Sequence, residues 1–179
     1  MQEEYILKVN YEDKMIDKIS KTDAHFQPIL HRAFSVFLFS GSKVLLQRRA
    51  KGKYHSELLV ANTCCSHPRT DDEILPQASK RLNEELGINY DNLKEVGSFI
   101  YCAKFNDNLY EYEYDHVIVG EVDENIKYKL NPQEVDSVFW MEIEDVKEDL
   151  VNNPQKYAVW FFEAFNIFLN YYNNFKSYF

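Results

Sequence analysis

The chain has 179 residues, of which 45% are hydrophobic and 16% aromatic, and its formal net charge is −9. This composition excludes a disordered chain and predicts one domain, residues 1–179, around one core. The first residues lack a basic start followed by an apolar run, and no later run of about 18 apolar residues is free of charges. We therefore expect a cytoplasmic protein with no membrane partner. The acidic balance also argues against nucleic acid, which proteins bind through clustered lysine and arginine.

The N-terminal half reads mainly as strands, because apolar residues alternate or run continuously between turn residues. Strands are predicted at residues 5–9, 15–19, 33–39 and 44–46, followed by a polar loop at 50–58 and an extended segment at 60–65.

A helix is predicted over residues 72–86, where apolar side chains recur on one face. Asp71 or Asp72 is expected to cap its start, Pro76 fits in its first turn, and Gly87 is expected to end it.

The C-terminal half is predicted to contain strands at 94–105, 110–122 and 136–141, and then two helices. The first helix covers residues 144–152 and ends before Pro154. The second begins near Tyr157 and has an aromatic stripe on one face, which indicates a helix packed on the core. The fold class is therefore α/β or α+β, a mixed sheet with helices packed on it.

Glu111 and Glu113 lie where acidic residues alternate with tyrosines. In a strand, residues two apart face the same side, so the two carboxylates are expected to share one face. On a buried face they repel each other unless a cation or a shared proton relieves the repulsion. The pattern thus indicates either a buried cation site or an acidic edge strand facing solvent.

Three histidines offer nitrogen ligands for such a cation. His25, His31 and His67, with the two glutamates, would make a shell of three nitrogens and two oxygens, open to water or substrate. Taken singly, each histidine also fits a surface or hydrogen-bonded role. His55, in the polar loop, and His116, in a strand, have no comparable context.

Cys65 is the candidate reactive thiol, because it precedes His67 by two residues in Asn-Thr-Cys-Cys-Ser-His-Pro. A thiol near an imidazole and a bound cation can have a lowered pKa. The alternative is a small buried hydrophobe, which is our expectation for Cys64. Cys102 is expected to be an ordinary strand residue, and the odd number of cysteines predicts free thiols.

Two groups of charged residues complete the candidates. Arginines and lysines at 48, 49, 51 and 53 follow a predicted strand and can hold phosphate oxygens. In the predicted helix, Arg81 and Glu85 either form an ordinary ion-paired face or line a metal–diphosphate site.

Taken together, these segments resemble the type I isopentenyl-diphosphate isomerase family, a branch of the Nudix superfamily. The resemblance covers about residues 21–160. It is carried by Asn-Thr-Cys-Cys-Ser-His-Pro at 62–68, Asn-Glu-Glu-Leu-Gly at 83–87 and Tyr-Glu-Tyr-Glu-Tyr-Asp at 110–115. It implies a Nudix-like mixed β-sheet core sandwiched by helices, with extra N-terminal strands and C-terminal helices. It also implies a monomer or homodimer that acts on a small allylic or homoallylic diphosphate in isoprenoid biosynthesis.

The resemblance further implies two metal ions and a substrate pocket. One divalent ion, Mn²⁺, Mg²⁺ or Zn²⁺, would be held by His25, His31, His67, Glu111 and Glu113. A Mg²⁺ that arrives with the diphosphate would be held by Glu85 and the backbone carbonyl of Cys65. The diphosphate would contact Lys21, Arg49, Lys53 and Arg81, and Trp160 would close over the hydrocarbon.

The implied reaction places a proton on C4 of isopentenyl diphosphate and removes one from C2, giving dimethylallyl diphosphate through a tertiary carbocation-like state. Two groups on opposite faces of the flat alkene can do this. By the resemblance, Glu113, supported by Tyr101, protonates the alkene and Cys65 deprotonates it. The π face of Trp160 can steady the cation.

Two other readings remain open at this stage. A Nudix hydrolase of diphosphates usually has a glutamate directly after the arginine of its motif helix, where this chain has Lys80-Arg81. A non-catalytic, metal-stabilised binding module would have a closed ligand shell with no open position.

Overall fold

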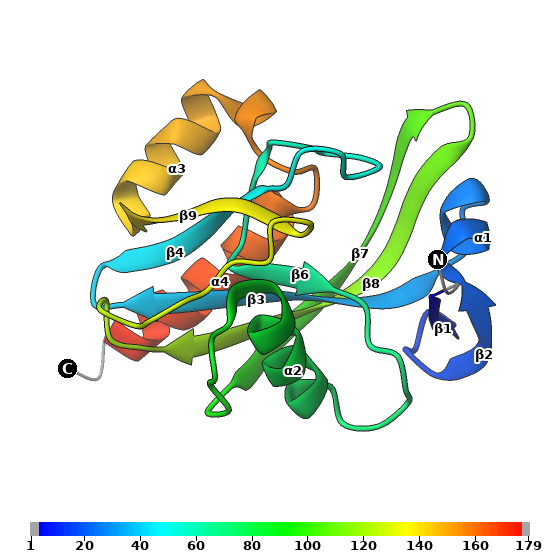
Figure 1. Cartoon of the computed structure of the whole chain (residues 1–179), viewed down its shortest axis with the longest axis horizontal. Helices are drawn as coiled ribbons and strands as arrows, with labels where there is room; N and C mark the ends of the chain where they lie inside the picture. The colour runs from blue at the N-terminus through cyan, green and yellow to red at the C-terminus, as the bar shows by residue number, and fades with distance from the viewer. Residues whose placement is uncertain (1–3, 177–179) are drawn as a thin grey trace.

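The computed structural model describes residues 4–176, in which nine strands form one mixed sheet (Figure 1). The strands are β1 (Tyr5–Val9), β2 (Met15–Ser20), β3 (His31–Ser40), β4 (Lys43–Arg49), β5 (Val60–Ala61), β6 (Cys64–Ser66), β7 (Lys94–Asn106), β8 (Leu109–Glu121) and β9 (Val135–Glu142). Every strand predicted from the sequence is present, although several ends differ by a few residues.

Strand β3 lies at the centre of the sheet. It pairs antiparallel with β1, β4 and β6, and parallel with β8. Its side chains are buried almost throughout, which fits the largely apolar run Ala33–Phe39 and is usual for a strand covered on both faces. Strand β8 is therefore an inner strand, between β3 and β7.

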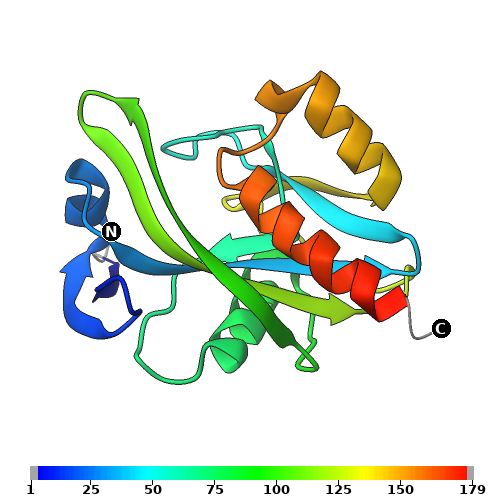
Figure 2. The ribbon, with the colours of Figure 1, turned by 180° about the vertical axis from the view of Figure 1, so that it is seen from behind.

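Helices cover both faces of the sheet, and the mixed α+β class is as predicted. They are α1 (Lys21–Phe26), α2 (Ile74–Leu86), α3 (Ile143–Asn152), the short 3₁₀ helix η1 (Pro154–Lys156) and α4 (Phe161–Lys176). Helix α2 lies in front of the sheet in Figure 1, and α4 lies in front in the reverse view of Figure 2. None of the helices within residues 4–176 is long and apolar enough to cross a membrane.

Each helix-covered face has its own apolar core. On one face, Phe37 of β3 stacks on Phe168 of α4 with ring centroids 5.0 Å apart. The predicted stripe of α4 is confirmed, because its buried residues are Phe161, Ala164, Phe165, Phe168 and Tyr172. On the other face, Ala78 and Leu82 of α2 pack in the cluster that contains Phe34 and Val36. The two cores fix the sheet between its helices.

Helix α2 begins two residues later than expected. The prediction that Asp71 or Asp72 caps it is wrong, since the N-cap is Glu73 and no side chain caps the helix. Asp71 instead accepts a hydrogen bond from Arg32 Nη1 at 2.7 Å. The other two expectations hold: Gly87 ends the helix in the left-handed region, at φ 66°, and the proline lies in the first turn.

The predicted start of the last helix near Tyr157 is also wrong, since α4 begins at Phe161. Tyr157 forms a parallel bridge with Val60, and the N–H of Ala158 donates to the Val60 carbonyl at 2.9 Å. This extended segment docks the chain against β5 before α4 starts.

Helix α1 has no counterpart in the sequence prediction. The Ser20 hydroxyl caps it by accepting a hydrogen bond from the N–H of Asp23 at 3.0 Å. Its last turn carries the buried His25, so this short helix matters for the site.

Candidate active site

Strand β8 presents a row of buried acidic side chains. Glu111, Glu113 and Asp115 alternate along it and are each at most 5% exposed. The expectation that both glutamates share one face is therefore met, and the alternative of a solvent-facing edge strand is wrong. Burial next to Glu113 raises the pKa of Glu111 well above its usual range. Burial also raises the pKa of Glu113, but its contacts with His31 and His67 outweigh this effect and hold the pKa well below its usual range.

The strand register brings two partners to Glu113. In the parallel pairing of β3 with β8, His31 lies opposite Glu113, and in the antiparallel pairing of β7 with β8, Tyr101 lies opposite it. The Tyr101 hydroxyl lies 2.6 Å from Glu113 Oε2 and 3.0 Å from Glu111 Oε2. Because a hydroxyl has one proton, it cannot donate fully to both carboxylates. The repulsion between Glu111 and Glu113 is therefore not relieved by Tyr101 alone.

Three histidines from three separate elements converge on Glu113. His25 comes from α1, His31 from the start of β3, and His67 from the segment just after β6. The Nε2 atoms of His67 and His31 lie 2.8 Å and 3.4 Å from Glu113 Oε1. One ligand atom from each of these four residues lies within 4.8 Å of the others.

Two of these imidazoles are oriented by the backbone. Nδ1 of His25 lies 2.6 Å from the Lys21 carbonyl, and Nδ1 of His31 lies 2.8 Å from the Ile29 carbonyl. When Nδ1–H donates to a carbonyl, Nε2 keeps its lone pair for a metal. Burial, with the neighbouring imidazoles, lowers the pKa of His25 to about 3, and burial lowers the pKa of His67 to about 4, so both are neutral near pH 7.

A divalent cation fits this cluster. Buried neutral imidazoles and two repelling carboxylates are a donor set for a first-row metal. His31 Nε2 is buried and has no hydrogen-bond partner, although a carboxylate oxygen lies 3.4 Å away. A cation between these groups would satisfy the unpaired nitrogen and relieve the carboxylate repulsion.

A second group of donors adjoins the first. His25, His55 and Glu111 also place ligand atoms within 4.8 Å of one another. His55 was given no role in the sequence prediction, yet its Nε2 lies 2.7 Å from Glu111 Oε1. The available signal was its position two residues after Lys53, in a loop expected to reach the substrate.

Cys65 lies in the same pocket, beside a guanidinium group. Arg49 Nη1 lies 3.4 Å from Cys65 Sγ, and the guanidinium carbon is 5.1 Å from the centre of the Trp160 ring. Contrary to the expected lowering, burial raises the pKa of the thiol to about 12, while the positive charge of Arg49 opposes the rise. The neighbouring Cys64 points into the core and is fully buried, as expected.

Trp160 lines the apolar end of the pocket, and Tyr101 packs near it. Their rings lie 6.4 Å apart, and Trp160 packs with Ala61 and Ala158. The indole N–H of Trp160 donates to Asn62 Oδ1 at 3.0 Å, which fixes the plane of the ring.

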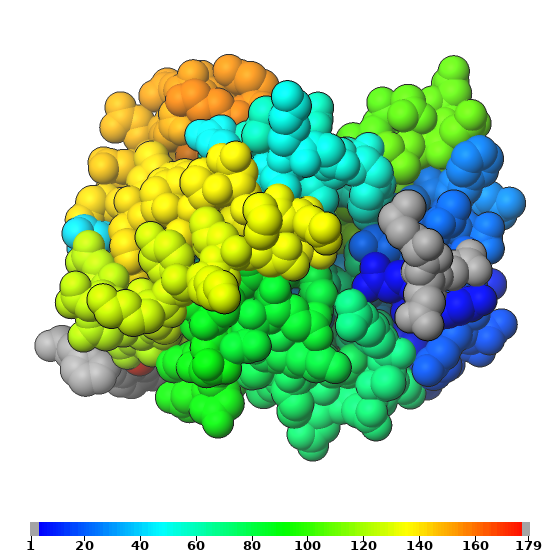
Figure 3. Space-filling model, in the orientation of Figure 1, coloured from blue at the N-terminus to red at the C-terminus, as the bar shows by residue number. Residues whose placement is uncertain are grey.

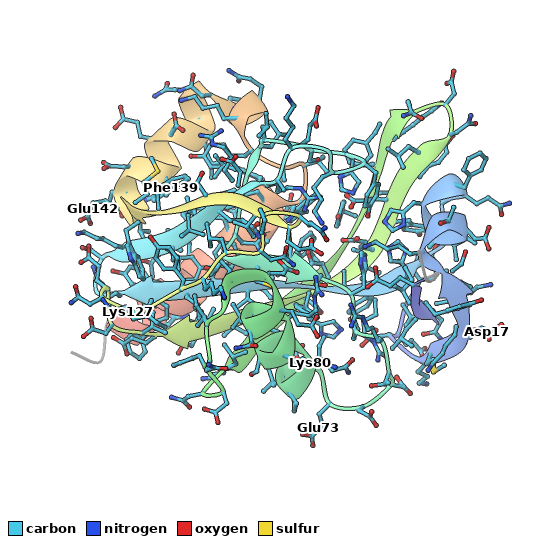
Figure 4. The ribbon with its side chains drawn as sticks, viewed as in Figure 1. Asp17, Glu73, Lys80, Lys127, Phe139 and Glu142 are labelled. Atoms are coloured by element: carbon cyan, nitrogen blue, oxygen red, sulfur yellow. The ribbon has the colours of Figure 1, made fainter. Side chains whose placement is uncertain are left out.

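The pocket contains the four predicted diphosphate contacts. Lys21, Arg49, Lys53 and Arg81 all line it, and its polar end lies at Lys53, Arg81 and Glu85, while Arg49 also lies against the Trp160 ring. Arg81 Nη2 pairs with Glu85 Oε1 at 2.6 Å, and Lys53 pairs with Glu134, an acidic residue that the sequence analysis did not single out. Lys80, by contrast, points outward from α2 with its side chain 70% exposed (Figure 4).

All predicted site residues are thus gathered in one region. His25, His31, His67 and Glu113 form the first donor group, and Glu111 belongs to the second. Glu85 stands apart from both groups, in the polar end of the pocket. The loop of residues 50–59, cyan in the space-filling view, lies at the surface between the orange helix α3 and the green tip of the β7–β8 hairpin (Figure 3).

Comparison with known proteins points to one family. Residues 29–161 match the NUDIX domain family. The chain is 42% identical over 159 residues to isopentenyl-diphosphate Delta-isomerase 2 of Aromatoleum aromaticum, covering 88% of this chain and 82% of that protein. It is 42% identical over 160 residues to isopentenyl-diphosphate Delta-isomerase of Serratia proteamaculans, covering 89% and 88%.

A solved structure supports the fold alone. DR0079 from Deinococcus radiodurans superposes with a TM-score of 0.66 at 18% identity, covering 84% of this chain and 90% of that one. With the sequence matches and the site geometry, the assignment is clear. The chain belongs to the isopentenyl-diphosphate Delta-isomerase family, within the Nudix superfamily.

Proposed function

We infer that this protein is an enzyme that interconverts isopentenyl diphosphate and dimethylallyl diphosphate, and that Cys65 and Glu113 transfer the protons. The single observation that carries the residue assignment is their shared pocket, in which an apolar end meets a polar, cationic end. A five-carbon diphosphate has the same division, with a hydrocarbon at one end and an anion at the other.

The polar end suits the diphosphate. Lys21, Arg49, Lys53 and Arg81 line the pocket, and three of these cations are now paired with glutamates. Phosphate oxygens can replace those carboxylates, because charge-assisted hydrogen bonds from guanidinium and ammonium groups suit both kinds of anion. Glu85 lies beside Arg81, where its carboxylate can hold a Mg²⁺ bound to the diphosphate, together with the carbonyl of Cys65.

The apolar end suits the alkene. Trp160 and Tyr101 can flank the hydrocarbon, and the π face of the indole can steady positive charge that develops on C3. The isomerisation needs one proton added at C4 and one removed at C2. Cys65 and Glu113 are the two groups of the pocket assigned to these transfers, with Tyr101 hydrogen-bonded to the carboxylate at 2.6 Å.

We propose that His25, His31, His67, Glu111 and Glu113 hold one divalent ion, Mn²⁺, Mg²⁺ or Zn²⁺. When bound, the ion supplies positive charge that neutralises the two carboxylates and fixes their positions. The protein's own contribution is to orient Glu113, through the backbone-anchored imidazoles of His25 and His31 and through Tyr101.

Proton NMR of isopentenyl diphosphate in D₂O tests this function. With the purified protein and Mg²⁺ plus Mn²⁺, dimethylallyl diphosphate is expected to appear with deuterium at C4. Chelation is expected to stop the conversion, and added metal to restore it. An unchanged substrate, combined with phosphate release from added nucleoside diphosphates, would replace this function with that of a hydrolase.

A further inference from the structure

The loop of residues 50–59 places a fourth imidazole beside the proposed metal centre. His55 is buried, 6% exposed, and its Nε2 lies 2.7 Å from Glu111 Oε1. Despite this short distance, Nε2 has no hydrogen-bond partner, because its geometry toward the carboxylate is not that of a hydrogen bond. A lone pair facing a carboxylate oxygen at this distance is repulsive unless positive charge lies between them.

The ring of His55 is held firmly in this orientation. It stacks on Phe105 with centroids 4.6 Å apart and meets Tyr54 and Trp160 edge-on. Its Nδ1 lies 3.2 Å from the Ser56 hydroxyl, which can accept the Nδ1 proton and leave Nε2 free. Its carbonyl accepts a hydrogen bond from Arg49 Nη2 at 3.4 Å.

The backbone of the loop supports the same placement. Ser56 and Leu58 both have positive φ, 51° and 60°, a conformation that costs a residue with a side chain about 1–2 kcal/mol. The carbonyl of Leu58 accepts from Arg48 Nη1 at 2.9 Å, and Leu58 N–H donates to the Arg49 carbonyl at 3.2 Å. These contacts hold the tight turn that aims His55 inward.

We propose that His55 is an additional ligand of the divalent cation, bound through Nε2 on the side of Glu111. His25, His55 and Glu111 form a donor group that shares His25 with the group of His31, His67 and Glu113. Ligand atoms from both donor groups can therefore bind the same ion. A fourth imidazole favours first-row transition metals, Mn²⁺ and Co²⁺ among them, over Mg²⁺, which prefers oxygen ligands. The inference rests on the proposed metal centre.

The test uses metal-free protein titrated with Mn²⁺ and with Mg²⁺, and pulsed EPR to count the imidazole nitrogens bound to Mn²⁺. The variants are His55→Gln and His55→Ala. Glutamine retains an N–H that can bind Glu111 but has no imidazole nitrogen, so it separates a ligand from a hydrogen-bonding role. His116→Gln is the matched control, because His116 is buried against Asp13 and Glu95 and belongs to neither donor group.

Both His55 variants are expected to lose one bound nitrogen and to weaken Mn²⁺ binding roughly tenfold or more, with a smaller effect on Mg²⁺. The control is expected to keep the wild-type nitrogen count and Mn²⁺ affinity. Wild-type nitrogen counts in both His55 variants, or full recovery of Mn²⁺ affinity in His55→Gln, would overturn the proposal.

His31→Ala separates this proposal from the metal centre on which it rests. If the wild type binds Mn²⁺ and His31→Ala loses it while the His55 variants do not, the centre stands and His55 is not a ligand. If the wild type binds no Mn²⁺, both are overturned.

Discussion

At the scale of single residues, the Tyr54 hydroxyl is hydrogen-bonded to the nitrogen of His25 that we propose as a metal ligand. It lies 3.0 Å from His25 Nε2, while Nδ1 of the same ring is engaged by a backbone carbonyl. A cation can bind this nitrogen only after the hydroxyl leaves. Since a neutral hydrogen bond contributes about 1 kcal/mol, Tyr54→Phe is expected to tighten Mn²⁺ binding roughly fivefold in a calorimetric titration.

Tyr90→Phe provides the control for the loss of a hydroxyl, because the Tyr90 hydroxyl donates to the Glu121 carbonyl, away from the histidines. It is expected to leave the Mn²⁺ affinity unchanged. Weaker binding in Tyr54→Phe would mean that the hydroxyl assists the cation and does not compete with it.

Some site residues could be predicted from the sequence, and others could not. The alternation of glutamate with tyrosine was enough to place Glu111 and Glu113 on one face, because strand periodicity is local. His55 could not be found in this way. Its approach to Glu111 depends on Ser56 and Leu58, which both have positive φ. Serine and leucine rarely adopt this conformation, so the sequence does not predict it.

At the scale of elements, helix α2, which carries Arg81 and Glu85, ends at Gly87 in the left-handed region. A Cβ at Gly87 would lie 2.9 Å from the backbone nitrogen of Lys129, and its φ is 66°. Gly87→Ala is therefore expected to lower the free energy of unfolding by about 2–3 kcal/mol, measured by urea denaturation.

Gly41→Ala is the matched control, because Gly41 has a φ of 55° but nothing within 4 Å of the added Cβ. In Gly41→Ala, only backbone strain is expected to lower the free energy of unfolding, by about 1–2 kcal/mol. Equal losses in the two variants would show that Lys129 moves aside and that its contact adds nothing to the penalty at Gly87.

Elements were predicted best where one pattern decides them. The apolar runs of the strands and the stripe of α4 needed no tertiary information. The start of α2 could not be predicted without tertiary information, because Asp71 binds Arg32 from another part of the chain and does not cap the helix. Tyr157 likewise joins Val60 of β5, which postpones α4. In both cases a long-range contact overrode a local preference.

At the scale of the whole molecule, the site joins elements distant in sequence, and a cation is expected to stabilise them together. Buried carboxylates that repel each other destabilise the metal-free protein. Mn²⁺ at about 100 times its dissociation constant should add about 2.7 kcal/mol, or roughly 5–10 °C in the midpoint of thermal unfolding. His31→Ala should lose most of this gain, and an equal gain in that variant would place the stabilising ion elsewhere.

The three-dimensional arrangement of the site residues could not be predicted from the sequence alone. The parallel pairing of β3 with β8 sets His31 beside Glu113, although the two residues lie far apart in the sequence and no local pattern indicates that they meet. The family resemblance supplied the list of residues. The structure supplied the register that brings them together.

The most direct test of the proton-transfer assignment compares Cys65→Ala with Cys64→Ala in D₂O, by following deuterium incorporation into dimethylallyl diphosphate. The two thiols are adjacent, but one lines the pocket and the other is buried in the core. Cys64→Ala is expected to remain within a few-fold of the wild-type rate, and Cys65→Ala to fall by roughly 100-fold or more. Equal rates in the two variants would contradict the assignment of Cys65 to proton transfer.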